Sequence, residues 1–315
     1  MVLHNIQALR GAAALAVIFY HIGPLSGEFQ FPIGRAGVDV FFVVSGFIMA
    51  HIWGRSDRFL LDRAIRVLPL YWIITAAAFV GFAAFPALQP ETPPNLLQSF
   101  LLLPGETSGW ALIVAWTLVW EMIFYGLLTV FRHHRPFLTT GIVLVAMTLT
   151  GIVFRPVEPV AAMLTATVAL SFIGGILIAR CKAHPHARIA LALGIVWFAA
   201  YAALGLPLEA HDFWRGVWFA PPAMLLVYGA VGVAGRIRPL EHLGDASYSL
   251  YLTHVPVMAV LAKTSEMATG QRPPALLLLI ATIAAAWLTY VWIERLLMAY
   301  FKKLRSESRP VLTIS

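Results

Sequence analysis

Charged residues are scarce in this sequence. Asp, Glu, Lys and Arg make up 12% of the 315 residues, whereas ordinary soluble domains hold about 25%. The mean hydropathy is +0.81, so water cannot be the main solvent of this chain. Apolar runs of about 20 residues, the length that crosses a bilayer as a helix, recur along the whole chain with short polar breaks between them. This distribution leaves no room for a sizeable soluble domain.

Cysteine and metal-binding patterns are also lacking. Cys181 is the only cysteine, which excludes an intramolecular disulfide, and no spacing of Cys and His indicates a zinc site, so no metal is expected. His133 and His134 lie among arginines, as is typical of a solvated loop. The net charge of +7 would indicate a nucleic-acid partner only if the basic residues lay on one soluble face. They are scattered among loops instead, so no nucleic acid is expected.

Ten membrane-spanning helices are predicted, with Pro and Gly marking the breaks between them. The predicted spans cover residues 5–23, 36–52, 66–85, 109–131, 137–154, 159–179, 188–206, 214–234, 246–262 and 274–299. Residues 95–104 are too few to span and are expected to lie along the interface. The sequence thus predicts an all-α, polytopic membrane bundle, with one transmembrane domain over residues 1–300 and a short cytoplasmic tail over residues 301–315.

Lys and Arg are unevenly divided between alternate loops. Fifteen of them fall in the even-numbered loops and the C-terminal tail, whereas five fall in the odd-numbered loops, namely Arg35, Arg155, Arg215, Lys263 and Arg272. Basic loops stay on the cytoplasmic side of a membrane during insertion. Both termini are therefore predicted to be cytoplasmic.

Two ionisable side chains lie inside the first predicted span. Burying such a group in a bilayer costs roughly 2.5–3.5 kcal/mol, so each invites a functional explanation. Arg10 and His21 are eleven residues apart, which places them within about 20° on one helix face and about 16 Å apart along the axis. We expect both to face one interior cavity. In the alternative interpretation, Arg10 reaches out to the lipid headgroups and His21 caps the outer helix end.

The second span carries an acid and a pair of small residues. Asp39 lies at the depth expected for His21, where a carboxylate can orient an imidazole and raise its basicity. Alternatively, Asp39 is a helix-start acid favoured by the helix dipole. Ser45 and Gly46 are more typical of close helix packing than of a nucleophile, although Ser45 is kept as a candidate of the substrate cavity.

Two arginines lie three residues apart at the expected membrane edge before the third span. Arg63 and Arg66 share one helical face. Paired guanidinium groups suit the phosphates of a nucleotide-like donor, because each can donate two parallel hydrogen bonds. The alternative is that both arginines only anchor the cytoplasmic side of the helix.

The fourth span has a polar face. Thr117, Glu121 and Tyr125 follow one another at four-residue spacing, and Glu121 is the most deeply placed acid of the sequence. Glu121 either pairs with Arg10 or helps to hold a substrate, and the sequence leaves both interpretations open.

Polar residues also mark the last two spans. Ser247, Tyr251 and His254 form one stripe at the start of the ninth span. Glu294 and Arg295 lie together near the cytoplasmic end of the tenth. These side chains, apart from Arg295, are assigned with Tyr125 to the wall of a substrate cavity.

These motifs follow one another along nearly the whole chain. In order they are Leu9-Arg10-Gly11 with Tyr20-His21, the GVDVFFVVSGF stretch, Arg63 and Arg66 leading to Pro69 and Tyr71, the segment 116–125, Ser247-Tyr248-Ser249-Leu250-Tyr251 with His254, and Glu294-Arg295. In this order the chain resembles the acyltransferase 3 family, bacterial membrane acyltransferases that modify cell-surface polysaccharides. It is more closely similar to the exopolysaccharide-production members. Each motif alone is modest, but six in order with ten spans are specific.

The resemblance implies an O-acyltransferase in the bacterial inner membrane, among lipids and the polysaccharide-synthesis machinery. It implies acetyl-CoA, or a related acyl-CoA, as the cytoplasmic donor and a hydroxyl of a carbohydrate or lipid-linked oligosaccharide as the acyl acceptor. The resemblance makes His21 the catalytic residue, and Asp39 and Glu121 are added as catalytic candidates from their positions in the spans. The residues implied for the donor site are Arg10, Arg63 and Arg66. Histidine suits the role because its ordinary pKa, near 6.5, lets it take the hydroxyl proton at cellular pH.

Two other classes of function fit the same residues. In a transporter or flippase for a sugar-containing substrate, the intramembrane charges Arg10, His21, Asp39 and Glu121 form a proton or sugar path without covalent chemistry. The other alternative is a non-catalytic membrane subunit of a polysaccharide-synthesis complex. Transfer of an acetyl group by the purified protein separates the first interpretation from both.

Overall fold

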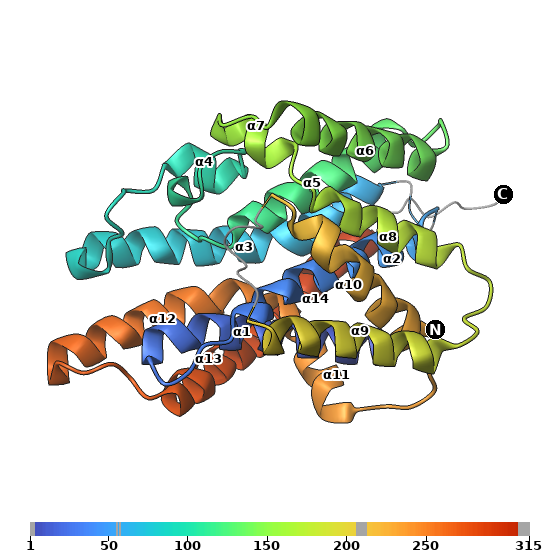
Figure 1. Ribbon diagram of the computed structural model, residues 1–315. Helices are drawn as coiled ribbons and strands as arrows, with labels where there is room; N and C mark the ends of the chain where they lie inside the picture. The colour runs from blue at the N-terminus through green and yellow to red at the C-terminus, as the bar shows by residue number, and fades with distance from the viewer. Residues whose placement is uncertain (1–3, 55, 57, 206–212, 308–315) are drawn as a thin grey trace.

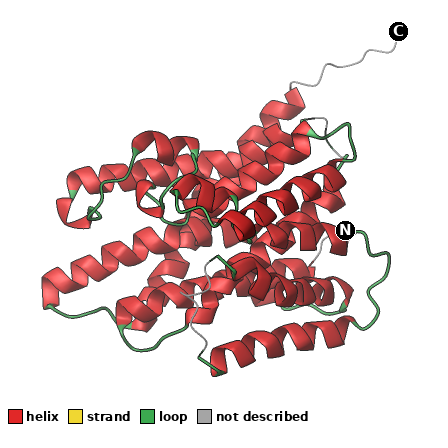
Figure 2. Cartoon of the chain, turned by 45° about the horizontal axis from the view of Figure 1, so that its top comes forward, coloured by secondary structure: helices red, strands yellow, loops and turns green. Residues whose placement is uncertain are grey.

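The computed structural model describes residues 4–54, 56, 58–205 and 213–307, and all regular elements in these ranges are helical (Figure 2). Two adjacent helices, α1 (His4–Ser26) and α2 (Gly37–Ile52), lie at the centre of the bundle (Figure 1). A short 3₁₀ turn, η1 (Pro32–Ala36), joins them. Helices packed on this pair are α8 (Ala169–Ala179), α10 (Arg215–Gly232), α11 (Arg238–Asp245), α12 (Ser247–Thr269) and α13 (Ala275–Thr289).

The remaining helices extend the bundle on both sides of this centre (Figure 1). The elements that follow α2 and precede α8 are α3 (Phe59–Ala84), η2 (Pro86–Leu88), α4 (Leu96–Leu101), η3 (Thr107–Gly109), α5 (Ala115–Val130), α6 (Pro136–Phe154) and α7 (Pro159–Leu164). Helix α5 packs on α3 and α6, and α9 (Ala187–Ala203) packs on α10.

The last described residues form a helix that packs against α3. A π-helical turn, η5 (Tyr290–Glu294), joins α13 to α14 (Arg295–Glu307). Arg305 of α14 pairs with Asp62 of α3 at 2.8 Å. Helix α14 therefore continues across the predicted boundary at residue 300, and residues 308–315 of the predicted tail lie outside the described residues.

The predicted all-helical architecture is confirmed, but the predicted count of ten membrane spans is not. A helix lies within each of the ten predicted segments, yet only six stretches of the described chain are long and apolar enough to cross a bilayer. They are His4–Ser26, Pro32–Ile52, Phe59–Ala84, Pro136–Phe154, Pro159–Ala179 and Ala275–Arg305. Helices α5 and α9 are apolar but shorter, at 16 and 17 residues.

Large apolar side chains are exposed on the outer helices. Ile142 and Val153 of α6 are 59% and 69% exposed, and Leu276 of α13 is 65% exposed. Such faces are stable against lipid chains and not against water. The outside of the bundle is therefore a membrane surface.

The sixth predicted span is broken at residues 165–168, between α7 and α8. The hydroxyl of Thr167 donates to the carbonyl of Phe213 at 2.5 Å and accepts the backbone N–H of Gly216 at 2.9 Å. The Thr167 side chain thus ties the break to two backbone groups of the segment that enters α10 and satisfies both groups inside the bundle. The apolar sequence of residues 159–179 does not indicate that the helix is interrupted here.

Glycine allows α2 and α8 to cross closely. A Cβ atom at Gly46 would lie 2.2 Å from the carbonyl oxygen of Phe172, and one at Gly175 would lie 2.0 Å from that of Val43. No side chain fits at such distances. Gly46 is thus a packing residue, as the sequence indicated, and the neighbouring Ser45 faces a cavity instead.

Helix α11 is fastened to the start of α1 outside the predicted spans. Glu241 accepts hydrogen bonds from Arg236 at 2.7 Å and lies 3.0 Å from the Nδ1 atom of His4. The hydrogen-bonded guanidinium of Arg236 holds the pKa of the Glu241 carboxyl below its ordinary value. Glu241 is therefore a carboxylate, and in this form it connects α11 to the first residue of α1.

Candidate active site

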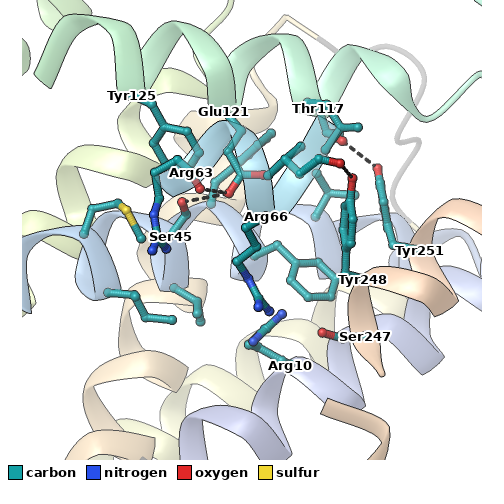
Figure 3. Close-up of a pocket in the computed structure, with 18 residues that line it drawn as sticks. Arg10, Ser45, Arg63, Arg66, Thr117, Glu121, Tyr125, Ser247, Tyr248 and Tyr251 are labelled. Carbon is teal, nitrogen blue, oxygen red and sulfur yellow. Dashed lines mark hydrogen bonds between the residues drawn. The ribbon is translucent and has the colours of Figure 1, made fainter. Parts of the chain in front are cut away.

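An inner cavity of about 140 Å³ lies where α1, α2, α3, α5 and α12 meet. All three predicted donor-site arginines line it, Arg10 from α1 and the other two from successive turns of α3 (Figure 3). Its polar lining consists of Arg10, Ser45, Arg63, Arg66, Thr117, Glu121, Tyr125, Ser247, Tyr248 and Tyr251. Predicted site residues from five helices are thus brought together in one place.

The three guanidinium groups of the inner cavity are only partly satisfied. Arg10 donates to the side chain of Gln7 at 2.9 Å, and the side chains of Arg10 and Arg66 point toward one another (Figure 3). The buried Nε atom of Arg63 has no hydrogen-bond partner among the described residues. Converging guanidinium groups can hold a polyanionic ligand, because an anion between them relieves their mutual repulsion.

Glu121 is the one carboxylate of the inner cavity. It accepts hydrogen bonds from the hydroxyl of Ser45, at 3.2 Å, and from that of Tyr125. Within the described residues it forms no ion pair, so the predicted alternative of a Glu121–Arg10 salt bridge is wrong. The predicted common face of α5 is confirmed, because Thr117, Glu121 and Tyr125 all line this cavity.

A second, outer cavity of about 570 Å³ contains His21. Ligand pockets in proteins commonly measure roughly 300–1,000 Å³, so this cavity can hold a substrate group. Its wall includes three indole rings and several polar side chains. The residues concerned are Tyr20, His21, Arg35, Glu106, Trp110, Trp116, Trp120, Arg215 and Tyr251.

The two cavities meet at Val38 and Tyr251, which line both. The hydroxyl of Tyr251 is held by a hydrogen bond of 3.0 Å to Thr117 (Figure 3). The prediction that Arg10 and His21 face one cavity is therefore corrected. They face two adjoining cavities, because residues about 16 Å apart on one helix face reach different depths of the bundle.

His21 has a second histidine beside it. The ring centroids of His21 and His254 are 5.0 Å apart, and His254 is fully buried. The Nδ1 atom of His254 lies 3.1 Å from the carbonyl oxygen of Leu250. A carbonyl only accepts, so Nδ1 carries the proton and Nε2 is left as an acceptor. That Nε2 atom has no hydrogen-bond partner among the described residues.

Asp39 is bound by an arginine and not by His21. The Nε atom of Arg215 donates to the Asp39 carboxylate at 2.9 Å, and its Nη2 atom donates to the carbonyl of Arg35 at 2.5 Å. A fully buried carboxylate requires such a partner. The prediction that Asp39 orients His21 is therefore wrong. The sequence placed Arg215 in a loop, whereas it begins α10, which packs on α2.

A family model described as an acyltransferase domain matches residues 3–291 of the sequence. The chain belongs to this family. The match covers the elements that build both cavities, from α1 to the π-helical turn. The family predicted from the six motifs is confirmed.

Three relatives of this acyltransferase are informative. The exopolysaccharide production protein ExoZ of Rhizobium meliloti (strain 1021) is 36% identical over 82% of this chain and 86% of its own length. The protein BcsY of Komagataeibacter xylinus is 25% identical over 81% of this chain and 73% of its own length. The peptidoglycan O-acetyltransferase OatA of Listeria monocytogenes serovar 1/2a is 23% identical over 92% of this chain and 55% of its own length. No solved structure matches with statistical significance.

Two residues predicted to line the substrate cavity of this membrane acyltransferase lie elsewhere. His254 is buried behind His21 and lines neither cavity. Glu294 also lines neither, because its carboxylate accepts a hydrogen bond of 2.6 Å from Ser249 within the bundle. The other four candidates, Ser45, Tyr125, Ser247 and Tyr251, do line the inner cavity.

Several lining residues of this acyltransferase were missed from the sequence. Tyr248 lines the inner cavity and donates to the carbonyl of Val67 at 2.6 Å. It lies between Ser247 and Tyr251, so the polar stripe was a usable signal. Arg215 and Trp116 line the outer cavity, with the guanidinium 5.4 Å from the ring centroid. Nothing in the spacing of the sequence indicates that this pair meets.

Proposed function

We propose that this membrane acyltransferase transfers an acetyl group from acetyl-CoA to a hydroxyl of a polysaccharide or of its lipid-linked precursor. One observation carries the proposal: a cavity lined by three arginines adjoins a cavity that contains a histidine. Two relatives point to the reaction, since ExoZ is named for exopolysaccharide production and OatA is named a peptidoglycan O-acetyltransferase.

The inner cavity is the proposed donor site. Arg10, Arg63 and Arg66 supply donors for phosphate oxygens, and Lys would not replace them fully because it lacks the two-pronged geometry. At about 140 Å³ the cavity is smaller than the roughly 300–1,000 Å³ of whole-ligand sites, so it takes the acyl-bearing arm and the adjoining phosphates. The arm then brings its thioester toward Val38 and Tyr251.

The outer cavity is the proposed site of the acyl acceptor. Trp116 is partly exposed and offers an apolar ring on which the C–H face of a sugar can lie, whereas Trp110 and Trp120 are almost fully buried in the wall of this cavity. Glu106 and Tyr20 line the same cavity and can exchange hydrogen bonds with sugar hydroxyls. Apolar platforms with a few polar groups are the usual composition of a site for a partly apolar ligand.

His21 is the proposed general base. It takes the proton of the sugar hydroxyl while the hydroxyl oxygen attacks the carbonyl carbon of the thioester. The new C–O ester bond forms, the C–S bond breaks, and coenzyme A leaves as a thiolate that receives the proton from His21. The reaction needs no further reactant, since the products are one acetyl ester and one thiol.

His254 is proposed to orient His21, in the role first expected of Asp39. Because its Nδ1 proton is directed to Leu250, its Nε2 atom can accept the N–H of a neighbouring imidazole. An N–H held in this way leaves the other nitrogen of His21 as the base. His254 thus acts through His21 and is a positioning residue.

The protein is proposed to lie in the inner membrane of a bacterial cell. The arginine-lined end of the bundle is proposed to face the cytoplasm. Coenzyme A is a cytoplasmic donor, and the uneven division of Lys and Arg between loops favours the same orientation. Reporters fused after Arg309 and near Thr92 should then lie on opposite sides of the membrane. Enzymes of polysaccharide synthesis are the proposed partners.

Acetyl transfer by the purified protein tests the proposal. The protein in lipid nanodiscs is given radiolabelled acetyl-CoA and a lipid-linked oligosaccharide extract of the producing bacterium. Label should enter the oligosaccharide as an alkali-labile ester, with one coenzyme A thiol released for each ester formed. Movement of oligosaccharide across vesicles without ester formation would instead favour a flippase, and the absence of both activities would favour a structural subunit.

A further inference from the structure

A third cavity, of about 340 Å³, lies beside the start of α3 and the end of α5. Its wall combines two aromatic rings with three basic side chains. The residues concerned are Trp53, Arg58, Phe59, Arg132 and His133. Neither Arg58 nor Arg132 forms a side-chain ion pair within the described chain. Arg58 and Arg132 are two of the fifteen basic residues from which the membrane orientation was predicted, and His133 was assigned to a solvated loop.

The third cavity adjoins the inner cavity through one pair of rings. Phe59, which lines the third cavity, contacts Tyr125, which lines the inner one, with ring centroids 6.0 Å apart and planes at 90°. Arg63 follows Phe59 by about one turn of α3. Figure 3 shows Arg63 beside Tyr125 at this border of the inner cavity. The inner and third cavities are therefore neighbours on either side of this ring pair.

The inner and third cavities differ in volume. The inner cavity, at about 140 Å³, has no room for a purine nucleotide in addition to an acyl-bearing arm, whereas the third is more than twice as large. Trp53 and Phe59 offer ring faces of the kind on which a purine stacks. Arg58 and Arg132 supply forked donors for a phosphate that the arginines of the inner cavity do not reach.

We propose that the third cavity binds the 3′-phosphoadenosine end of coenzyme A, with Arg58 and Arg132 as ligands of the 3′-phosphate and Trp53 against the adenine. This assignment rests on the proposed function, because it assumes a coenzyme A donor in the inner cavity. It divides the donor site in two: the inner cavity holds the arm and the third cavity holds the nucleotide. The 3′-phosphate then becomes a determinant of donor affinity.

Calorimetry with coenzyme A and with dephospho-coenzyme A, which lacks the 3′-phosphate, tests the assignment. The wild-type protein should bind coenzyme A at least about tenfold more tightly, as charge-assisted contacts to one phosphate imply. Arg58→Ala and Arg132→Ala should each remove most of this preference and leave the affinity for dephospho-coenzyme A unchanged. Arg238→Ala is the matched control, because Arg238 is an exposed arginine at the start of α11. It should retain the full preference.

The two proposals fail in different ways. Wild-type protein that transfers acetyl groups but binds coenzyme A and dephospho-coenzyme A equally would overturn the nucleotide subsite and leave the proposed function standing. The same holds if both arginine variants keep the tenfold preference. Absence of any coenzyme A binding by the wild-type protein would overturn both. Binding of 4′-phosphopantetheine, which lacks the nucleotide, should be equal in all variants and shows that each has folded.

Discussion

His21 and His254 lie with their imidazole rings 5.0 Å apart, the first on the wall of the outer cavity and the second buried behind it. They come from α1 and α12, which pack side by side. The backbone carbonyl of Leu250 fixes the tautomer of His254 and so determines which atom it presents to its surroundings. Two helices and one backbone hydrogen bond therefore determine how these two imidazole rings lie relative to one another.

Replacing His21 by Gln should abolish most acetyl transfer without unfolding the protein. A positioned general base contributes roughly 10²- to 10⁴-fold to a rate, and the turnover number should fall by at least that much. Coenzyme A affinity, measured by calorimetry, should stay within about twofold, because His21 does not line the inner cavity. A well-folded His21→Gln protein that retains more than about a tenth of the wild-type rate would remove His21 from the mechanism.

Replacing His254 separates a positioning role from a packing role. His254→Phe fills the buried space but has no acceptor for an N–H, and the turnover number should fall roughly 10- to 100-fold, as for other groups that orient a functional histidine. His254→Gln keeps an acceptor oxygen and should recover part of the loss. The KM for acetyl-CoA should be unchanged in both. Equal activity of the two variants, with melting temperatures that fall in step, would assign His254 to packing alone.

The faces of single helices were predictable from the sequence. Arg63 and Arg66, like Thr117, Glu121 and Tyr125, follow the helical repeat, which fixes the side of a helix without knowledge of its neighbours. Each of these groups does line the inner cavity. Apolar runs likewise indicated a helix in every predicted span. The number of crossings was not predictable in this way, since α5 and α9 are shorter than a span, and α10 and α12 are long enough but too polar.

The partners of buried charges were not predictable in the same way. Asp39 and Arg215 are 176 residues apart, and their contact depends on how α10 packs on α2. Depth in the membrane, the property used to pair Asp39 with His21, is shared by every helix that crosses the same layer. Packing between distant helices decides among the groups at one depth, and local spacing carries no information about it.

The Asp39–Arg215 pair should be a stability determinant. Removing one partner of a buried ion pair costs about 3–5 kcal/mol, because the other charge stays buried without compensation. Asp39→Leu and Arg215→Met should each lower the unfolding midpoint of the detergent-solubilised protein. The double variant should recover most of the loss, since it leaves neither charge behind. If the single variants unfold like the wild type, the pair does not hold α2 to α10.

The inner-cavity arginines should control donor affinity. Arg63→Ala and Arg66→Ala each remove charge-assisted contacts worth about 1.5–3 kcal/mol, so the Kd for coenzyme A should rise roughly tenfold or more. Lys at either position should recover only part of the affinity, because it cannot donate in a fork. Calorimetry on the folded variants provides the measurement. Unchanged affinity in both alanine variants would return these arginines to the role of membrane anchors.

Val38 should control passage between the two cavities. It lines both, together with Tyr251, so an acetyl group that moves from the arginines to His21 passes its side chain. Val38→Phe adds a ring at this point and should lower acetyl transfer more than about tenfold. Coenzyme A affinity should change less than about twofold.

Two further variants of α2 serve as controls for Val38→Phe. Overpacking costs roughly 1–3 kcal/mol, so Val40→Phe, at a buried position of α2 that lines neither cavity, is the control for general destabilisation. Val38→Ala removes bulk where the two cavities meet and should keep transfer near the wild-type rate. Transfer by a folded Val38→Phe protein at the wild-type rate would show that the acyl group does not cross between the cavities here, and the roles of donor and acceptor cavities would have to be assigned anew.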